Sequence, residues 1–222
     1  MAPEAPSILL VDDHAVIAAP LAMALQASGF GTVAAADPDD LSTEAVVEQA
    51  RRIGADIVLL DLHLGRGRIG VPMVEPLRRT GAKVLLFTAA ADPDLIAGAL
   101  KAGAEAVVDK AMPFHGLVGA INAVASGETL IPEDERAALI EALDRREGEQ
   151  DARLRPFRSL TDREEAILRD LVDGRSPKEI ARADRISVST VRGHIASVLG
   201  KLGVNSQREA LALARAAGWP PA

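Results

Sequence analysis

Short runs of apolar residues alternate with longer stretches of helical spacing over residues 7–127 of the chain. A short, unbroken apolar run is typical of a strand buried on both faces of a parallel sheet. Five such runs occur, at Ile8–Val11, Thr32–Ala35, Ile57–Leu60, Val84–Phe87 and Ala106–Val108. The helical stretches are Ala15–Ala27, Ser42–Arg52, Val71–Arg79, Asp94–Ala102 and Phe114–Ser126. We therefore expect an α/β domain at residues 1–127, with a five-stranded, parallel, doubly wound sheet.

The rest of the chain has only helical patterns. A polar helix is expected from Pro132 to about Arg146, and the charged stretch after it breaks before Phe157, which indicates a partly helical linker at residues 128–157. Further on, Thr161-Asp-Arg-Glu164 and Ser206-Gln-Arg-Glu209 have the form of capping boxes, which start helices. Four helices with short connections predict a second, all-α domain at residues 158–222.

Charge is distributed unevenly between these domains. The formal net charge is −7, but residues 1–155 contain 14 basic and 24 acidic side chains, whereas residues 156–222 contain 11 and 8. This difference indicates two kinds of partner. The absence of cysteine excludes disulfides and thiolate metal sites. We expect a cytoplasmic protein without a membrane partner, because the N-terminus lacks the pattern of a signal peptide and no apolar run approaches the roughly 18 residues of a membrane span.

Carboxylates follow two of the predicted strands. Asp12 and Asp13 come after the first strand, and Asp61 directly follows the third. Residues at the carboxyl ends of parallel strands line the crevice where open α/β sheets bind ligands. Three clustered acids repel one another unless a cation lies among them, and Mg²⁺ is the hard divalent cation that carboxylates hold. The sequence therefore predicts a magnesium site at this edge of the sheet.

Two further polar residues follow the fourth and fifth strands. Thr88 can hydrogen-bond a phosphoryl oxygen, and Lys110 can stabilise one as a point charge. The Asp61 side chain can then attack phosphorus as a nucleophile. Each residue alone has an ordinary structural explanation, such as a helix N-cap or a turn. Their coincidence at successive strand ends favours a phosphoacceptor site.

The first domain resembles the receiver domain of two-component response regulators, which implies a flavodoxin-like fold. The resemblance covers residues 6–127 and depends on four motifs: Val11-Asp12-Asp13-His14, Leu60-Asp61-Leu62, Phe87-Thr88-Ala89 and Val108-Asp109-Lys110. It implies that a sensor histidine kinase phosphorylates Asp61. It also implies that Asp12, Asp13, Asp61 and the main-chain carbonyl of His63 hold Mg²⁺. Forming and hydrolysing its own phosphoryl group would then be the only chemistry of this domain.

Two features depart from that family. Val107 stands where relatives usually carry an aromatic residue, and Leu64–Gly70 replaces a loop that usually holds Met-Pro. Three glycines predict that this loop is flexible and solvated, although its two arginines could hold an anion. An alternative is therefore an atypical receiver controlled by a bound ligand or by constitutive dimerisation. An aspartate-nucleophile phosphatase is a second alternative, which the position of Asp61 after the third strand disfavours.

Residues 176–195 read as helix, tight turn, helix. In a helix-turn-helix, the second helix lies in the major groove of DNA. That helix is expected to begin at Ser187 or Ser189 and to present Ser189, Thr190, Arg192, Gly193 and Ala196 to the bases. Lys178, Arg182, Arg185 and Lys201 are the predicted phosphate contacts.

Residues 159–215 resemble the LuxR/NarL-type DNA-binding domain. The matching motifs are Leu160-Thr161-Asp162-Arg163-Glu164, Lys178-Glu179-Ile180-Ala181, Val188–Ile195 and Lys201-Leu202-Gly203-Val204. This resemblance implies a transcription regulator that binds double-stranded DNA as a homodimer when active, with Arg208–Ala217 as the first candidate for the dimer contact. Gly193 and Ala196 are shorter than the side chains of many relatives, which predicts greater reliance on Arg192 and on DNA shape.

Overall fold

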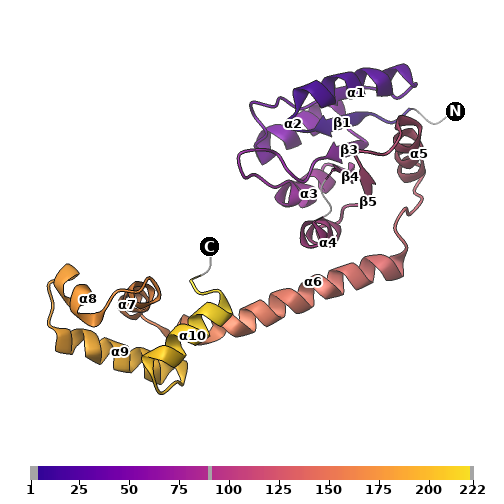
Figure 1. Ribbon diagram of the computed structural model, residues 1–222. Coiled ribbons are helices and arrows are strands. Elements are labelled where there is room, and N and C mark those ends of the chain that lie inside the picture. Colours follow the sequence, from indigo (N-terminus) through magenta and orange to yellow (C-terminus); the bar gives the residue numbers. More distant parts are fainter. Residues whose placement is uncertain (1–4, 90–91, 221–222) are drawn as a thin grey trace. The chain divides into compact units, whose positions relative to one another are not determined.

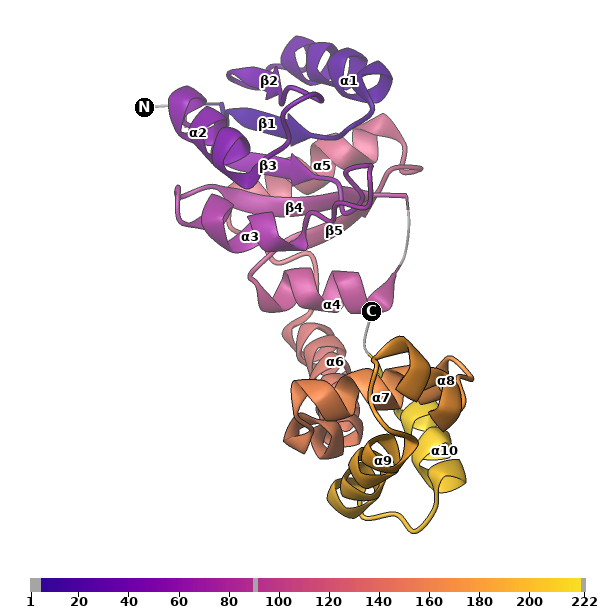
Figure 2. The same cartoon turned by 90° about the vertical axis from the view of Figure 1, so that its left-hand side faces the viewer.

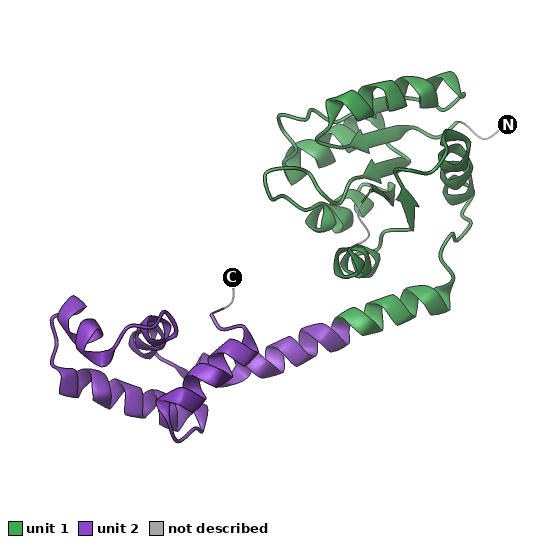
Figure 3. Ribbon diagram, viewed as in Figure 1, with its two compact units in different colours: residues 1–143 green, residues 144–222 purple. Residues whose placement is uncertain are grey.

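The computed structural model describes residues 5–89 and 92–220 (Figure 1). The chain forms two compact units, Met1–Leu143 and Asp144–Ala222 (Figure 3). Their boundary falls within helix α6 (Glu133–Leu154), which a short 3-10 helix, η1 (Arg155–Ser159), follows. The residues expected to form a linker are thus divided between the two units.

The first unit contains the predicted five-stranded parallel sheet. Its strand order is β2-β1-β3-β4-β5, and every neighbouring pair is parallel. The strands are β1 (Ile8–Val11), β2 (Val33–Ala35), β3 (Ile57–Leu60), β4 (Lys83–Thr88) and β5 (Ala106–Asp109). The helices are α1 (Ala15–Ala27), α2 (Thr43–Ile53), α3 (Val71–Arg78), α4 (Pro93–Lys101) and α5 (Phe114–Ala125). The predicted ends of these elements differ from the observed ends by no more than one residue.

Helices cover both faces of the sheet (Figure 2). On one face, Ile8 and Leu10 of β1 join a cluster with residues of α1 and α5. On the other, Leu9 and Val11 join a cluster with residues of α2, α3 and α4. Successive strand residues point to opposite faces of the sheet. Because helices cover both faces, all four residues of β1 are apolar.

The first half of α6 packs on the α4 side of this unit. Leu139 and Ile140 pack against the same cluster as Val107 of β5. Arg136 donates hydrogen bonds to the backbone carbonyls of Leu100, at 3.3 Å, and Glu105, at 3.0 Å. Val107 and the start of α6 therefore share one apolar cluster.

The second half of α6 belongs to the second unit. The helix extends beyond the predicted end near Arg146, because Gln150 donates a hydrogen bond to the carbonyl of Ala217 and Leu154 packs into the core of this unit. These contacts outweigh the cost of Gly148 within a helix, which is about 1 kcal/mol. Phe157 stacks on Trp219 with ring centroids 5.3 Å apart.

The second unit is helical throughout its described part. After η1 come α7 (Asp162–Val172), α8 (Pro177–Ala183), α9 (Val188–Leu202) and α10 (Gln207–Ala217). Both capping-box sequences start helices as predicted. Among the described residues, no helix combines the length and apolarity needed to span a membrane.

Candidate functional site

The carboxylates predicted from the two strand ends lie together. One ligand atom each from Asp12, Asp13, His14 and Asp61 falls within 4.8 Å of the others. Asp12 and Asp61 are each only 5% exposed, so their charges are largely removed from water. β1 and β3 are neighbours in the sheet, and Val11 pairs with Leu60. This register places the side chains of Asp12 and Asp61 next to each other.

Lys110 connects two of these acids. Its Nζ lies 2.5 Å from Asp12 Oδ2 and 2.6 Å from Asp61 Oδ2. Burial opposes the charged ammonium, but the hydrogen bonds to both carboxylates and their negative charges outweigh burial and raise the pKa of Lys110. Lys110 is therefore held protonated beside Asp61. The ring of Phe87 lies 5.9 Å from the ammonium and covers one side of it.

Thr88 lies at the end of β4, as predicted. It is 4% exposed, and its carbonyl accepts a hydrogen bond of 3.1 Å from the backbone N–H of Lys110. Thr88 also pairs in register with Asp109. The backbone thus places Thr88 beside the residue that carries the ammonium.

Asp13 has an unsatisfied oxygen. Its Oδ1 is buried and has no hydrogen-bond partner in the described parts of the chain. His14 Nδ1 lies 2.9 Å from this oxygen. The hydrogen bond of His14 Nδ1 is instead to Asp12 Oδ1, at 3.2 Å. A buried carboxylate oxygen without a partner is costly. This set of oxygen donors therefore fits a hard divalent cation such as Mg²⁺.

The pattern of residues at strand ends does not predict His14 as a member of this group. Its side chain is 61% exposed, and its backbone N–H donates to Asp12 Oδ1 at 2.8 Å. The signal was its position directly after Asp13. An exposed imidazole is not required by a magnesium site, because Mg²⁺ prefers oxygen ligands.

The loop after Asp61 differs from its expected flexible form. Residues 62–70 form a tight hairpin in which His63 bridges Ile69 and the N–H of Arg68 donates to the carbonyl of Gly65, at 2.9 Å. Leu62 and Leu64 are fully buried and anchor it. The backbone N–H of His63 donates to Asp61 Oδ1 at 3.2 Å, while its side chain is exposed.

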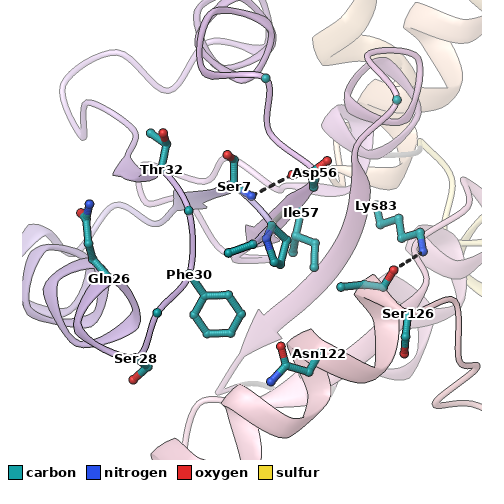
Figure 4. Close-up of a pocket in the computed structure, with 17 residues that line it drawn as sticks. Ser7, Gln26, Ser28, Phe30, Thr32, Asp56, Ile57, Lys83, Asn122 and Ser126 are labelled. Carbon is teal, nitrogen blue, oxygen red and sulfur yellow. Dashed lines mark hydrogen bonds between the residues drawn. The ribbon is translucent and has the colours of Figure 1, made fainter. Parts of the chain in front are cut away.

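A hollow lies at the end of the sheet opposite these acids (Figure 4). It has a volume of about 1130 Å³ and is lined by residues from the amino ends of strands, including Ser7, Asp56 and Lys83. Lys83 Nζ donates to the carbonyl of Val124, at 2.6 Å, and Asp56 accepts from the backbone N–H of Ser7. None of the predicted site residues lines this hollow.

In the second unit, α8 and α9 form the predicted helix-turn-helix. The side of α9 expected to face DNA is exposed and consists of Ser189, Thr190, Arg192, Gly193 and Ala196. Its opposite side, with Val191, Ile195 and Val198, is buried. Lys178, Arg182 and Arg185 are also exposed, and Arg185 adopts a φ of 55° in the turn between the helices.

Three hydroxyls meet at the start of α9. Ser187 is the N-cap, and its Oγ accepts from the backbone N–H of Thr190 at 3.0 Å. The same Oγ lies 2.7 Å from Ser189 Oγ and 2.8 Å from Thr190 Oγ1. The helix N-terminus and these hydroxyls offer donors suited to a backbone phosphate.

Lys201 is engaged within the protein. Its Nζ lies 2.6 Å from Glu164 Oε2, and Ser197 Oγ donates to Glu164 Oε1 at 2.5 Å. These bonds, with those from Thr161, lower the pKa of Glu164 to about 2 against the cost of burial. The network ties the start of α7 to α9. The capping-box sequence predicts Glu164 only as a capping residue of α7.

Comparisons with known proteins cover both units. The model of the response regulator receiver domain matches residues 8–122, and that of bacterial regulatory proteins of the luxR family matches residues 158–214. The chain is 32% identical over 205 residues to the nitrate/nitrite response regulator protein NarP of Escherichia coli, covering 90% of each. It is 30% identical over 173 residues to the transcriptional regulatory protein DesR of Bacillus subtilis, covering 78% of this chain and 79% of DesR.

A solved structure is similar to part of the chain. It is a two-component response regulator of the LuxR family from Aurantimonas sp. SI85-9A1, with 27% identity and a TM-score of 0.51. The match covers 63% of this chain and 97% of the solved one.

Proposed function

The chain belongs to the two-component response regulators with a LuxR-type DNA-binding domain, and we propose that a sensor histidine kinase controls its DNA binding by phosphorylating Asp61. Members of this family are DNA-binding transcription regulators. The observation that carries the proposal is the meeting of Lys110 with Asp12 and Asp61 beside an unsatisfied Asp13 oxygen.

Asp12, Asp13, Asp61 and the main-chain carbonyl of His63 are the proposed Mg²⁺ ligands. When bound, the cation would neutralise the acids and polarise phosphoryl oxygens. Asp13 Oδ1 supports this ligand set, because it is buried without a hydrogen bond from the described residues and a cation would supply that interaction.

Asp61 is the proposed nucleophile. A carboxylate oxygen of Asp61 forms a bond to phosphorus while the phosphorus–nitrogen bond of the donor phosphohistidine breaks; the leaving imidazole nitrogen keeps the bonding electron pair and takes up a proton from water. Water later attacks the same phosphorus, which releases inorganic phosphate and restores the carboxylate. Asp61 attacks as a carboxylate, and Lys110 Nζ lies 2.6 Å from its Oδ2.

Lys110 and Thr88 are the proposed partners of the transferred group. Once Asp61 carries a phosphoryl group, the ammonium that now bonds Asp61 Oδ2 can move to a phosphoryl oxygen nearby. Thr88 at the end of β4 can donate its hydroxyl to another. Both side chains would then leave their present positions. Their movement would change the surface next to the ends of β4 and β5.

For DNA binding, we propose that α9 enters the major groove. Arg192 would read a guanine edge or hold a phosphate, while Ser189, Thr190, Gly193 and Ala196 lie against the bases. Lys178, Arg182 and Arg185 would contact phosphates. Lys201, already paired with Glu164, would add a phosphate contact only from its exposed side. Two copies, joined through α10, would occupy paired half-sites.

The second candidate function is a receiver that is not switched by phosphorylation. Val107 favours it. This small side chain packs against the cluster that also holds the start of α6. A larger side chain at this position could move only by displacing its neighbours. In that case a ligand or constitutive dimerisation would control DNA binding.

Treatment of the purified protein with acetyl phosphate and Mg²⁺ tests the proposal. Mass spectrometry of the intact chain should show one added phosphoryl group, and Asp61→Asn should show none. Equal labelling of the two proteins would place the phosphoacceptor elsewhere. Repeated turnover of a small phosphate ester would instead indicate a phosphatase.

A further inference from the structure

The hairpin after Asp61 is closed by backbone hydrogen bonds of ordinary length. The N–H of Leu64 donates to the carbonyl of Arg68 at 3.0 Å, and the N–H of Gly70 donates to that of Leu62 at 2.9 Å. Leu62 and Leu64 are fully buried in the core beneath it. The position of the hairpin is therefore determined by the core and by its own hydrogen bonds.

Gly65 is the point at which this hairpin meets the acidic site. Its φ is +65°, and a Cβ at this position would lie 2.4 Å from Asp13 Oδ2. That distance is far below van der Waals contact. Gly67, two residues further on, has a similar φ of +74°, but a Cβ there would meet nothing within 4 Å among the described atoms. Of these two glycines, Gly65 alone lies against an acidic side chain.

This contact restricts the carboxylate of Asp13. The Gly65 backbone lies close to Oδ2, and Oδ1 is buried without a hydrogen-bond partner among the described residues. His14 Nδ1 lies 2.9 Å from this oxygen but does not meet it with hydrogen-bond geometry. A ligand that is held in place before the metal arrives binds it more tightly than a mobile one, because less conformational freedom is lost on binding.

We propose that Gly65 is a positioning residue for the divalent-cation site: its lack of a side chain lets the hairpin lie against Asp13 and hold this carboxylate toward Asp61. The inference rests on the proposed function, since it needs Mg²⁺ to bind at these acids. An alanine at residue 65 forces Asp13 or the hairpin to move, whereas one at residue 67 imposes a similar backbone strain without touching the site.

Titration of Mg²⁺ into the full chain, followed by amide chemical shifts, tests this inference. Gly65→Ala should weaken Mg²⁺ binding about 10–100-fold, the usual effect of losing a residue that orients a metal ligand. Gly67→Ala should bind Mg²⁺ as the wild type does. Equal affinities for the two variants, with a wild type that binds, would overturn the role of Gly65 and leave the proposed function intact. A wild type that binds no Mg²⁺ would overturn both.

A stability measurement separates the contact from the metal. Without Mg²⁺, Gly65→Ala should lower the melting temperature more than Gly67→Ala does, because only the former creates a clash. Truncation by Asp13→Ala removes the clashing oxygens, so in that background the two glycine variants should melt alike. A difference that persists in the Asp13→Ala background would show that Gly65 does not act through Asp13.

Discussion

Lys110 Nζ lies 2.6 Å from Asp61 Oδ2, although 49 positions separate the two residues in the chain. The parallel sheet brings them together, because β3 and β5 both end at the same edge and flank β4. The same ammonium bonds Asp12. One lysine therefore holds two of the three acids before any phosphoryl group arrives.

Lys110→Ala should slow phosphorylation of Asp61 by about 100-fold, since loss of one preorganised donor to a developing charge typically costs this much. The rate of labelling by acetyl phosphate measures it. Lys83→Ala is the matched control, because Lys83 donates to carbonyls at the end of α5, at the other end of the sheet. Similar rates for the two variants would show that Lys110 does not assist the transfer.

Much of this site could be predicted from the sequence because its residues directly follow apolar runs. The carboxyl ends of parallel strands meet at one edge of the sheet. The positions of Asp61, Thr88 and Lys110 directly after three strands are therefore enough to predict that they lie together. The hairpin could not be predicted. Three glycines in the sequence indicate a flexible backbone. The burial of Leu62 and Leu64 and the approach of Gly65 to Asp13 are visible only in the structure.

The helix-turn-helix could also be predicted from the sequence, because capping residues and apolar spacing mark the ends of its helices. The full length of α6 could not be predicted, since Gln150 bonds the carbonyl of Ala217, 67 residues further along the chain, and Leu154 packs into a core that includes residues of α10. The role of Glu164 was also hidden. A capping box explains its position in the sequence, but not the approach of Ser197 and Lys201 from another helix.

The stability of the second unit should fall at acid pH through Glu164. Because Lys201, Ser197 and Thr161 lower the pKa of Glu164 from 4.5 to about 2, its contribution is complete above about pH 4.5 and is lost as the pH falls toward 2. Glu164→Gln should remove on the order of 2 kcal/mol at neutral pH and flatten this acid dependence. Urea unfolding followed by the single tryptophan, Trp219, reports on this unit. Glu165→Gln, on the same helix, should keep the wild-type dependence, and a Glu164→Gln variant that does so as well would contradict the assignment.

Arg136→Ala should loosen the start of α6 from α4. The guanidinium bonds two backbone carbonyls, and its loss should cost about 1–3 kcal/mol because both acceptors lose a charged donor. Hydrogen exchange in Glu133–Leu143 should become faster, with Arg145→Ala, further along the same helix, as the control. Unchanged exchange in Arg136→Ala would mean that apolar packing alone holds this segment.

Arg192→Ala should weaken binding to a target promoter by about 10-fold or more, since a good contact to a base edge contributes about 1–3 kcal/mol. A fluorescence titration at several salt concentrations separates base reading from phosphate binding. Arg169→Ala on α7 removes the same charge outside the helix-turn-helix and should have a smaller effect. Unchanged affinity and salt dependence in Arg192→Ala would place the recognition surface elsewhere.

The most direct test of the phosphorylation switch is DNA affinity and oligomeric state with and without beryllofluoride, a phosphoryl mimic, in the presence of Mg²⁺. In the wild type, we expect beryllofluoride to promote dimers and tighten promoter binding. In Asp61→Asn, neither quantity should change. A wild type that does not respond, and behaves as Asp61→Asn does, would contradict control by phosphorylation of Asp61 and favour the receiver that is not switched in this way.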